Sequence, residues 1–132
     1  MPVTRIVIMI VRLAGLFALV LGLAFWSGRG LSLVNAHMGF GILVVLGLWI
    51  LAGFAGKAGV SLSTVILAVL WGLVVPVLGA VQLNLPPGGG YGIVRVLHLV
   101  VGLGALALAE TLASQIKRSP KRPLERPLTP KQ

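Results

Sequence analysis

The sequence contains no cysteine and no aspartate, and its acidic residues are Glu110 and Glu125. Without cysteine the chain cannot form a disulfide, a thiolate metal site, an iron–sulfur cluster or a covalent haem linkage through a C-x-x-C-H motif. Two glutamates also exclude the paired-carboxylate chemistry of many hydrolases and metal sites built from carboxylates. The sequence therefore leaves histidine as the side chain best suited to hold a metal.

Charge is scarce along most of the chain. Charged residues make up 10% of the sequence, against about 25% in soluble domains. Hydrophobic residues make up 58%, and the mean hydropathy is +1.07. This composition predicts an integral membrane protein that is embedded in the lipid bilayer.

The net charge of +9 is concentrated at one end, since six of the eleven basic residues lie in residues 117–132. No aromatic-rich basic surface accompanies them, so we expect no nucleic-acid partner. The same segment contains four prolines, which predicts a disordered basic cytoplasmic tail.

Four apolar segments precede the tail, and each is long enough for a helix to cross a hydrocarbon core about 30 Å thick. We expect transmembrane helices over about residues 6–26, 31–54, 60–83 and 91–116. Residues 1–116 would then form one domain. The fold class is an all-α membrane protein, an up-and-down four-helix transmembrane bundle.

The basic residues predict the orientation of this bundle. Arg5, Lys57 and the tail would lie on one side of the membrane, with Arg29 and Arg95 on the other. The positive-inside rule then places both termini in the cytoplasm, and we expect a multi-pass protein of a prokaryotic inner membrane. The second and fourth spans would run in the same direction.

The two histidines of the chain occupy matching positions in these two parallel spans. His37 and His98 each lie six or seven residues inside the outer end of a span, and each is followed four residues later by a glycine, Gly41 or Gly102. Diagonal helices of a four-helix bundle face each other across the core. Because neutral imidazole is a good iron ligand, the pair predicts one haem b per chain with both axial positions filled. The two glycines would leave room for the flat macrocycle.

Polar residues near the outer end fit the same hypothesis. Arg95 is one turn outward of His98 and is placed to pair with an anionic haem propionate. Arg29 in the outer loop and Asn35 near the outer end of the second span are further candidates. We expect the carbonyls of the preceding turns, at Leu33 and Val94, to accept hydrogen bonds from the imidazoles.

Two other interpretations of the histidines stay open. They could line a pocket for a quinone or another small ligand, or they could only hydrogen-bond neighbouring helices. Arg12 and Glu110 lie at similar depth on adjacent spans, which predicts a buried ion pair or snorkelling side chains that fix packing or, in a sharper hypothesis, a proton or quinone-headgroup site on the cytoplasmic side.

The arrangement resembles the haem-bearing four-helix bundle of membrane b-type cytochromes, as in the cytochrome b subunit of quinol-oxidising complexes. In that family the second and fourth helices carry the ligands, and glycines line the macrocycle. His37 and His98 match the outer ligand pair. The positions of the deeper pair are occupied by Leu51 and Leu112, so the resemblance implies a single haem.

The function expected from these observations is electron transfer, as a carrier or a subunit of a redox assembly rather than a stand-alone enzyme. A quinone or a redox protein would be the partner, within a homodimer or a larger membrane complex. Gly15, Ala18 and Gly22 form a small-residue stripe that could pack against a second copy or within the bundle. The alternatives are a non-catalytic accessory or scaffold subunit, and a small transporter subunit that uses the Arg12–Glu110 pair.

Overall fold

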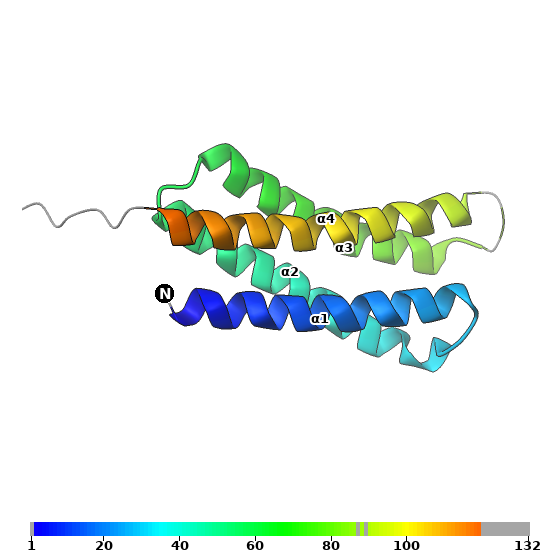
Figure 1. Ribbon diagram of the computed structural model, residues 1–132. Coiled ribbons are helices and arrows are strands. Elements are labelled where there is room, and N and C mark those ends of the chain that lie inside the picture. The colour runs from blue at the N-terminus through cyan, green and yellow to red at the C-terminus, as the bar shows by residue number, and fades with distance from the viewer. Residues whose placement is uncertain (1, 87, 89, 120–132) are drawn as a thin grey trace, which may run out of the picture.

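Four long helices run up and down alongside one another in the computed structural model, which describes residues 2–86, 88 and 90–119 (Figure 1). They are α1 (Pro2–Trp26), α2 (Val34–Lys57), α3 (Leu62–Asn84) and α4 (Tyr91–Arg118), with a single 3₁₀ turn, η1 (Leu31–Leu33), before α2. The described part of the chain has no strand. The expected all-α fold of four helices is confirmed.

α1 begins earlier, and α2 and α4 end later, than the apolar segments that predicted them, whereas α2 and α3 begin at Val34 and Leu62, later than the expected residues 31 and 60. α1 begins at Pro2, because a proline in the first turn lacks only an N–H that would have no helical partner. Lys57 ends α2, and Lys117 and Arg118 end α4. Basic side chains are favourable in the last turn of a helix, where the carbonyl ends carry partial negative charge. The connection expected between residues 54 and 60 and the tail expected from residue 117 therefore begin later, and residues 120–132 lie outside the described residues.

Each of the four helices is long and apolar enough to cross a membrane. Large aliphatic side chains are exposed all around the bundle, whereas many of the buried positions are alanines and glycines such as Ala52, Ala68 and Ala105. This distribution is typical of membrane helices, which pack through small residues and present large apolar side chains to lipid.

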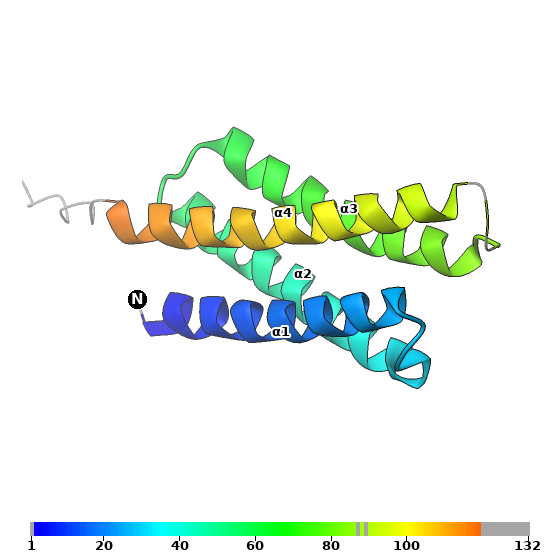
Figure 2. The same cartoon turned by 45° about the vertical axis from the view of Figure 1, so that its right-hand side comes forward.

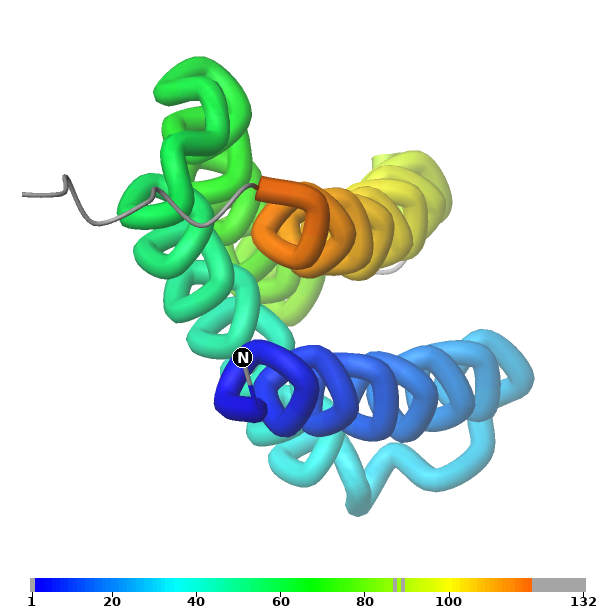
Figure 3. The backbone as a smooth tube through the Cα atoms, turned by 60° about the vertical axis from the view of Figure 1, so that its left-hand side comes forward, coloured from blue at the N-terminus to red at the C-terminus, as the bar shows by residue number. Residues whose placement is uncertain are grey.

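Two helices at diagonal positions of the bundle, α2 and α4, are in direct contact. α2 contacts each of the other three helices, and so does α4. Figure 2 shows α2 slanting from beside α1 at one end of the bundle to beside α3 and α4 at the other. Figure 3 shows α1 and α4 on the same side of α2. The beginning of α1 and the end of α4 lie at the same end, here called the inner end, and the α1–α2 and α3–α4 connections lie at the outer end (Figure 1).

Glycines act as sockets that hold the helices close together. At four of them a Cβ atom would collide with a side chain of the neighbouring helix. The pairs are Gly15 with Leu106, Gly47 with Val11, Gly72 with Trp49, and Gly104 with Trp71. Each contact lets one backbone approach another, which is the main source of packing energy between helices in lipid.

Both tryptophans in these sockets also donate a hydrogen bond. The indole of Trp49 donates to the carbonyl of Val69 at 3.2 Å, and that of Trp71 donates to the carbonyl of Val101 at 2.8 Å. In each case the accepting carbonyl lies three residues before the socket glycine. An indole N–H within an apolar bundle needs such a partner, so these contacts favour one rotation of α2, α3 and α4 about their axes.

Candidate metal centre

His37 and His98 face each other near the outer end of the bundle. Their ring centroids are 6.1 Å apart, and the ring planes are inclined at 53°. His37 lies in the first turn of α2 and His98 in the second turn of α4, and these two helices run in the same direction. The sequence-based expectation that the two imidazoles meet across the bundle is confirmed.

His37 is held in one tautomer by the neighbouring helix α1. Its Nδ1 lies 2.9 Å from the carbonyl oxygen of Ala18. A carbonyl can only accept a hydrogen bond, so Nδ1 carries the proton. The other ring nitrogen, Nε2, then keeps its lone pair, which is the form of imidazole that binds a metal.

The expectation that the Leu33 carbonyl would accept this bond is wrong. The His37 ring lies over Gly22 on α1, whose Cβ would stand 3.4 Å from Cε1. Because this glycine has no side chain, the backbone of α1 comes close enough for the Ala18 carbonyl to reach Nδ1. Phe25 packs its edge against the same ring, with centroids 5.5 Å apart.

His98 repeats this arrangement on the other half of the bundle. Its ring lies over Gly79 on α3, whose Cβ would stand 3.3 Å from Cε1. The helix pairs α1–α2 and α3–α4 therefore each contribute one histidine and one glycine that receives its ring. The contact with Gly79 places His98 against α3 as Gly22 places His37 against α1.

His98 lacks the hydrogen bond at Nδ1 that His37 makes. Nδ1 of His98 is buried and has no partner among the described residues, so the Val94 carbonyl does not fill the role expected of it. Ala18 lies four residues before Gly22, and the residue in the same relation to Gly79 is Val75. A buried polar atom left without a partner costs about 1–3 kcal/mol. The His98 ring is thus less firmly fixed than the His37 ring.

Gly41 and Gly102 border open space, unlike the socket glycines. A Cβ atom at either position would meet no atom within 4 Å. Both residues are half-buried and lie one turn deeper than a histidine on the same helix. No side chain therefore packs against either glycine one turn deeper than the histidines, as a flat ligand at this level would require.

Arg95, Arg29 and Asn35, the expected partners of the haem propionates, make no hydrogen bond to the two imidazoles within the described part of the chain. The Arg95 guanidinium lies over the rings of Trp26 and Tyr91, at 5.1 and 5.3 Å from their centroids. It joins the outer ends of α1 and α4 by cation–π contacts. Arg29 and Asn35 are exposed at this end.

Gln82 is a residue that the sequence analysis did not single out. Its Oε1 is buried and has no partner in the described part of the chain. Gln82 lies three residues beyond Gly79 on α3. A lone glutamine near a helix end carries no sequence signal, and only its burial marks it.

The two histidines are too few to hold a bare ion. No cluster of three or more histidine, cysteine, aspartate or glutamate side chains occurs within residues 2–86, 88 and 90–119. A haem needs only axial ligands from the protein, because its macrocycle supplies the other four. The donor set therefore fits a haem and does not fit an ordinary four-coordinate zinc site.

The expected pairing of Arg12 with Glu110 is confirmed, but the pair is exposed and not buried. Nε of Arg12 donates to Oε1 of Glu110 at 2.6 Å, and Nη2 donates to Oε2 at 2.8 Å. The pair links α1 to α4 in the inner half of the bundle. The two side chains are 61% and 45% exposed, so they lie on the outer surface and do not line the core.

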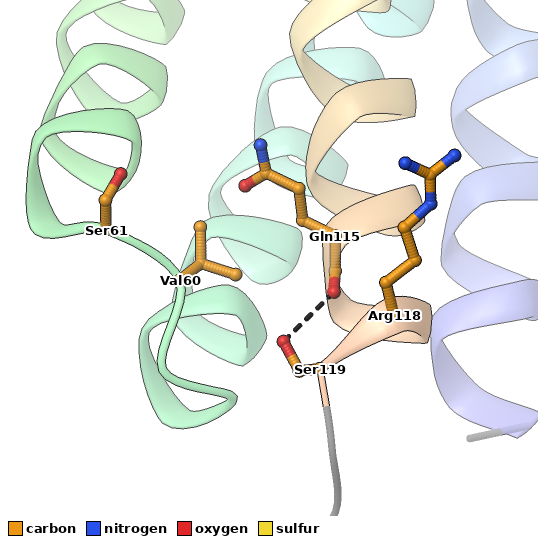
Figure 4. Close-up of a pocket in the computed structure, with 5 residues that line it drawn as sticks. All are labelled: Val60, Ser61, Gln115, Arg118 and Ser119. Carbon is orange, nitrogen blue, oxygen red and sulfur yellow. Dashed lines mark hydrogen bonds between the residues drawn. The ribbon is translucent and has the colours of Figure 1, made fainter.

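A separate hollow lies at the inner end. It has a volume of about 370 Å³ and is shallow, and it lies where the α2–α3 turn meets the end of α4 (Figure 4). Its lining residues are Val60, Ser61, Gln115, Arg118 and Ser119. The Ser119 hydroxyl donates to the Gln115 carbonyl at 3.0 Å. This hollow is at the opposite end from the histidines and is not part of their site.

Comparison of the chain with protein-family models, with curated proteins and with solved structures finds no match. The functional argument therefore rests on the geometry of the two histidines.

Proposed function

We propose that this chain is a small b-type haem protein of a prokaryotic inner membrane, with His37 and His98 as the axial ligands of one haem. The observation that carries the proposal is the separation of the two rings. With metal–imidazole bonds of about 2 Å, as for zinc, two rings on opposite sides of one metal have centroids roughly 6 Å apart. The observed separation is 6.1 Å.

Three further observations support the proposal. His37 is in the tautomer that leaves Nε2 free. Gly41 and Gly102, one turn deeper than the histidines, have no atom within 4 Å of an added Cβ. The His98 ring lies over Gly79 on α3 as the His37 ring lies over Gly22 on α1, so both rings are placed in the same way. A scaffold subunit would have no need of this combination.

A bis-histidine haem supplies one-electron chemistry without an open coordination position, so electron transfer is the activity that suits this site. The role of the protein is to hold two imidazoles level, to fix the tautomer of His37 and to surround the site with apolar helices. Arg95, Arg29 and Asn35 lie at the end toward which anionic propionates would point. The partner would be a quinone or a redox protein.

The transporter alternative has less support. The Arg12–Glu110 pair lies on the surface of the bundle, and the core at this level is filled by fully buried side chains that include Val11, Leu48 and Leu112. A polar path through the centre would need polar groups there.

The orientation belongs to the same proposal. Both described ends of the bundle lie on one side (Figure 1), and the basic residues at that side would place it in the cytoplasm. If protease added to intact cells cleaved a C-terminal tag, the orientation would be opposite to the one proposed, and the haem would lie near the cytoplasmic face.

The absorption spectrum of the purified protein tests the proposal directly. Protein made in haem-replete cells should show a Soret band, and its reduced form should show the sharp α and β bands of low-spin haem. One haem is expected per chain. Folded, helical protein without a Soret band would overturn the proposal.

A further inference from the structure

The Arg12–Glu110 pair occupies an unusual position for an ion pair. Arg12 is ten residues from the start of α1, and Glu110 is eight residues from the end of α4. At about 1.5 Å per residue, the pair lies about 12–15 Å from the inner ends of the helices. The hydrocarbon core is about 30 Å thick, so the pair lies inside it, on the outer surface of the bundle.

The contacts between the two side chains leave much of their hydrogen-bonding capacity unused. A guanidinium has five N–H groups, and two of them bond Glu110. The remaining donors of Arg12 and lone pairs of the carboxylate have no other partner among the described residues, and the two side chains are 61% and 45% exposed. Lipid tails offer neither donors nor acceptors, so exposure of these groups to lipid is costly.

On α4 the surface around the pair carries small residues, whereas on α1 the exposed neighbours of Arg12 are Met9 and Leu16. Ala107 and Ser114 lie on the same exposed face of α4 as Glu110, at spacings of three and four residues. Eleven residues from the inner ends of α2 and α3, the exposed positions are Leu46 and Leu73, whereas the equivalent position of α4 is Ala107. Small residues beside a polar group are typical of a surface against which another helix packs.

We propose that the face of α1 and α4 around Arg12, Ala107, Glu110 and Ser114, here called the α1/α4 face, binds a second copy of this chain. The charges of this face are self-complementary. A two-fold axis along the bilayer normal reverses every direction in the membrane plane, so the vector from Arg12 to Glu110 in one copy opposes that in the other. Each arginine then meets the partner's glutamate, and four charges satisfy one another.

The stripe of Gly15, Ala18 and Gly22 offers no competing surface. Gly15 receives Leu106, and Gly22 receives the ring of His37. The Ala18 carbonyl accepts the bond from His37. Of the two uses considered for this stripe, the structure shows packing within the bundle, which leaves the α1/α4 face as the surface for a second copy.

Single-cysteine cross-linking tests the proposal, because the chain has no cysteine of its own. Ala107→Cys lies on the α1/α4 face, and Leu46→Cys and Leu73→Cys are controls at equal depth on exposed positions of α2 and α3. Each variant is purified, reconstituted into phosphatidylethanolamine–phosphatidylglycerol vesicles and treated with a short bis-maleimide. The amount of lipid per protein is raised in steps, which dilutes the protein in the bilayer. We expect Ala107→Cys to give cross-linked dimer throughout and the two controls to remain monomeric.

A second set of variants tests the role of the charges. Arg12→Leu with Glu110→Leu, placed in the Ala107→Cys background, should reduce cross-linking by about tenfold or more, since charge-assisted hydrogen bonds are lost. Helical circular dichroism checks that the variant folds. Cross-linking of Ala107→Cys no greater than that of Leu73→Cys would overturn the proposal. Capture of a different membrane protein at Ala107 in native membranes, in place of a second copy, would overturn it as well.

Discussion

The imidazole rings of His37 and His98 face each other with their centroids 6.1 Å apart. The two residues lie on helices that run in the same direction, and each ring lies over a glycine of the preceding helix. The relation is nearly symmetric in space but not in hydrogen bonding, because Nδ1 of His37 is bonded to Ala18 while Nδ1 of His98 has no partner among the residues described. The predictions below start from this pair.

Replacement of either histidine should open the iron to external ligands. In His37→Ala or His98→Ala the haem would keep one imidazole and become five-coordinate, or it would be lost. Carbon monoxide difference spectra of the reduced protein should change from almost no binding to clear binding. Met38→Ala, one residue along α2 at an exposed position, is the matched control and should retain the low-spin spectrum. Unchanged spectra in both histidine variants would exclude them as ligands.

The glycines should divide into two classes when they are replaced. Gly102→Leu and Gly41→Leu enter open space, so they should lower haem occupancy while the protein without haem stays folded. Gly72→Leu and Gly104→Leu collide with tryptophans and should destabilise the bundle itself, by about 1–3 kcal/mol or more. Haem titration and thermal unfolding in detergent separate the two effects. Gly39→Leu, at an exposed glycine, controls for the loss of glycine alone.

The ion pair between Arg12 and Glu110 should be visible in a double-mutant cycle. Glu110→Gln leaves the Arg12 guanidinium without its carboxylate partner, and Arg12→Gln leaves the Glu110 carboxylate without its guanidinium partner. Each single change should destabilise the protein in bilayers, and the second change should cost less in the presence of the first. The measurement is the unfolding midpoint of the four proteins. Strictly additive effects would mean that the contact contributes nothing to stability.

Arg95 should raise the reduction potential of the haem. Reduction adds negative charge to the site, and a nearby positive charge favours that state. Arg95→Leu should therefore lower the midpoint potential measured by redox titration while the low-spin bands remain. Arg5→Leu, at the inner end of α1, removes the same charge far from the histidines and should leave the potential almost unchanged. Equal shifts in the two variants would indicate that Arg95 does not act locally.

The sequence by itself determined the number of helices and their order. Four apolar stretches of membrane-spanning length, separated by glycine- and proline-rich turns, allow little else, since every backbone polar group in lipid must be bonded within its own helix. Four alternating spans also make α2 and α4 parallel, and the two histidines then fall at one level. The pairing of Arg12 with Glu110 followed from depth in the same way.

Only the tertiary structure decided which groups touch. The partner of His37 is the Ala18 carbonyl of α1, because Gly22 lets that backbone come close. The use of Gly15 and Gly72 as sockets, and of Gly41 and Gly102 as borders of open space, depends on how each helix is rotated. The same rotation turns Arg12 and Glu110 outward. Helix rotation results from the packing of many side chains at once, and spacing along one chain does not contain it.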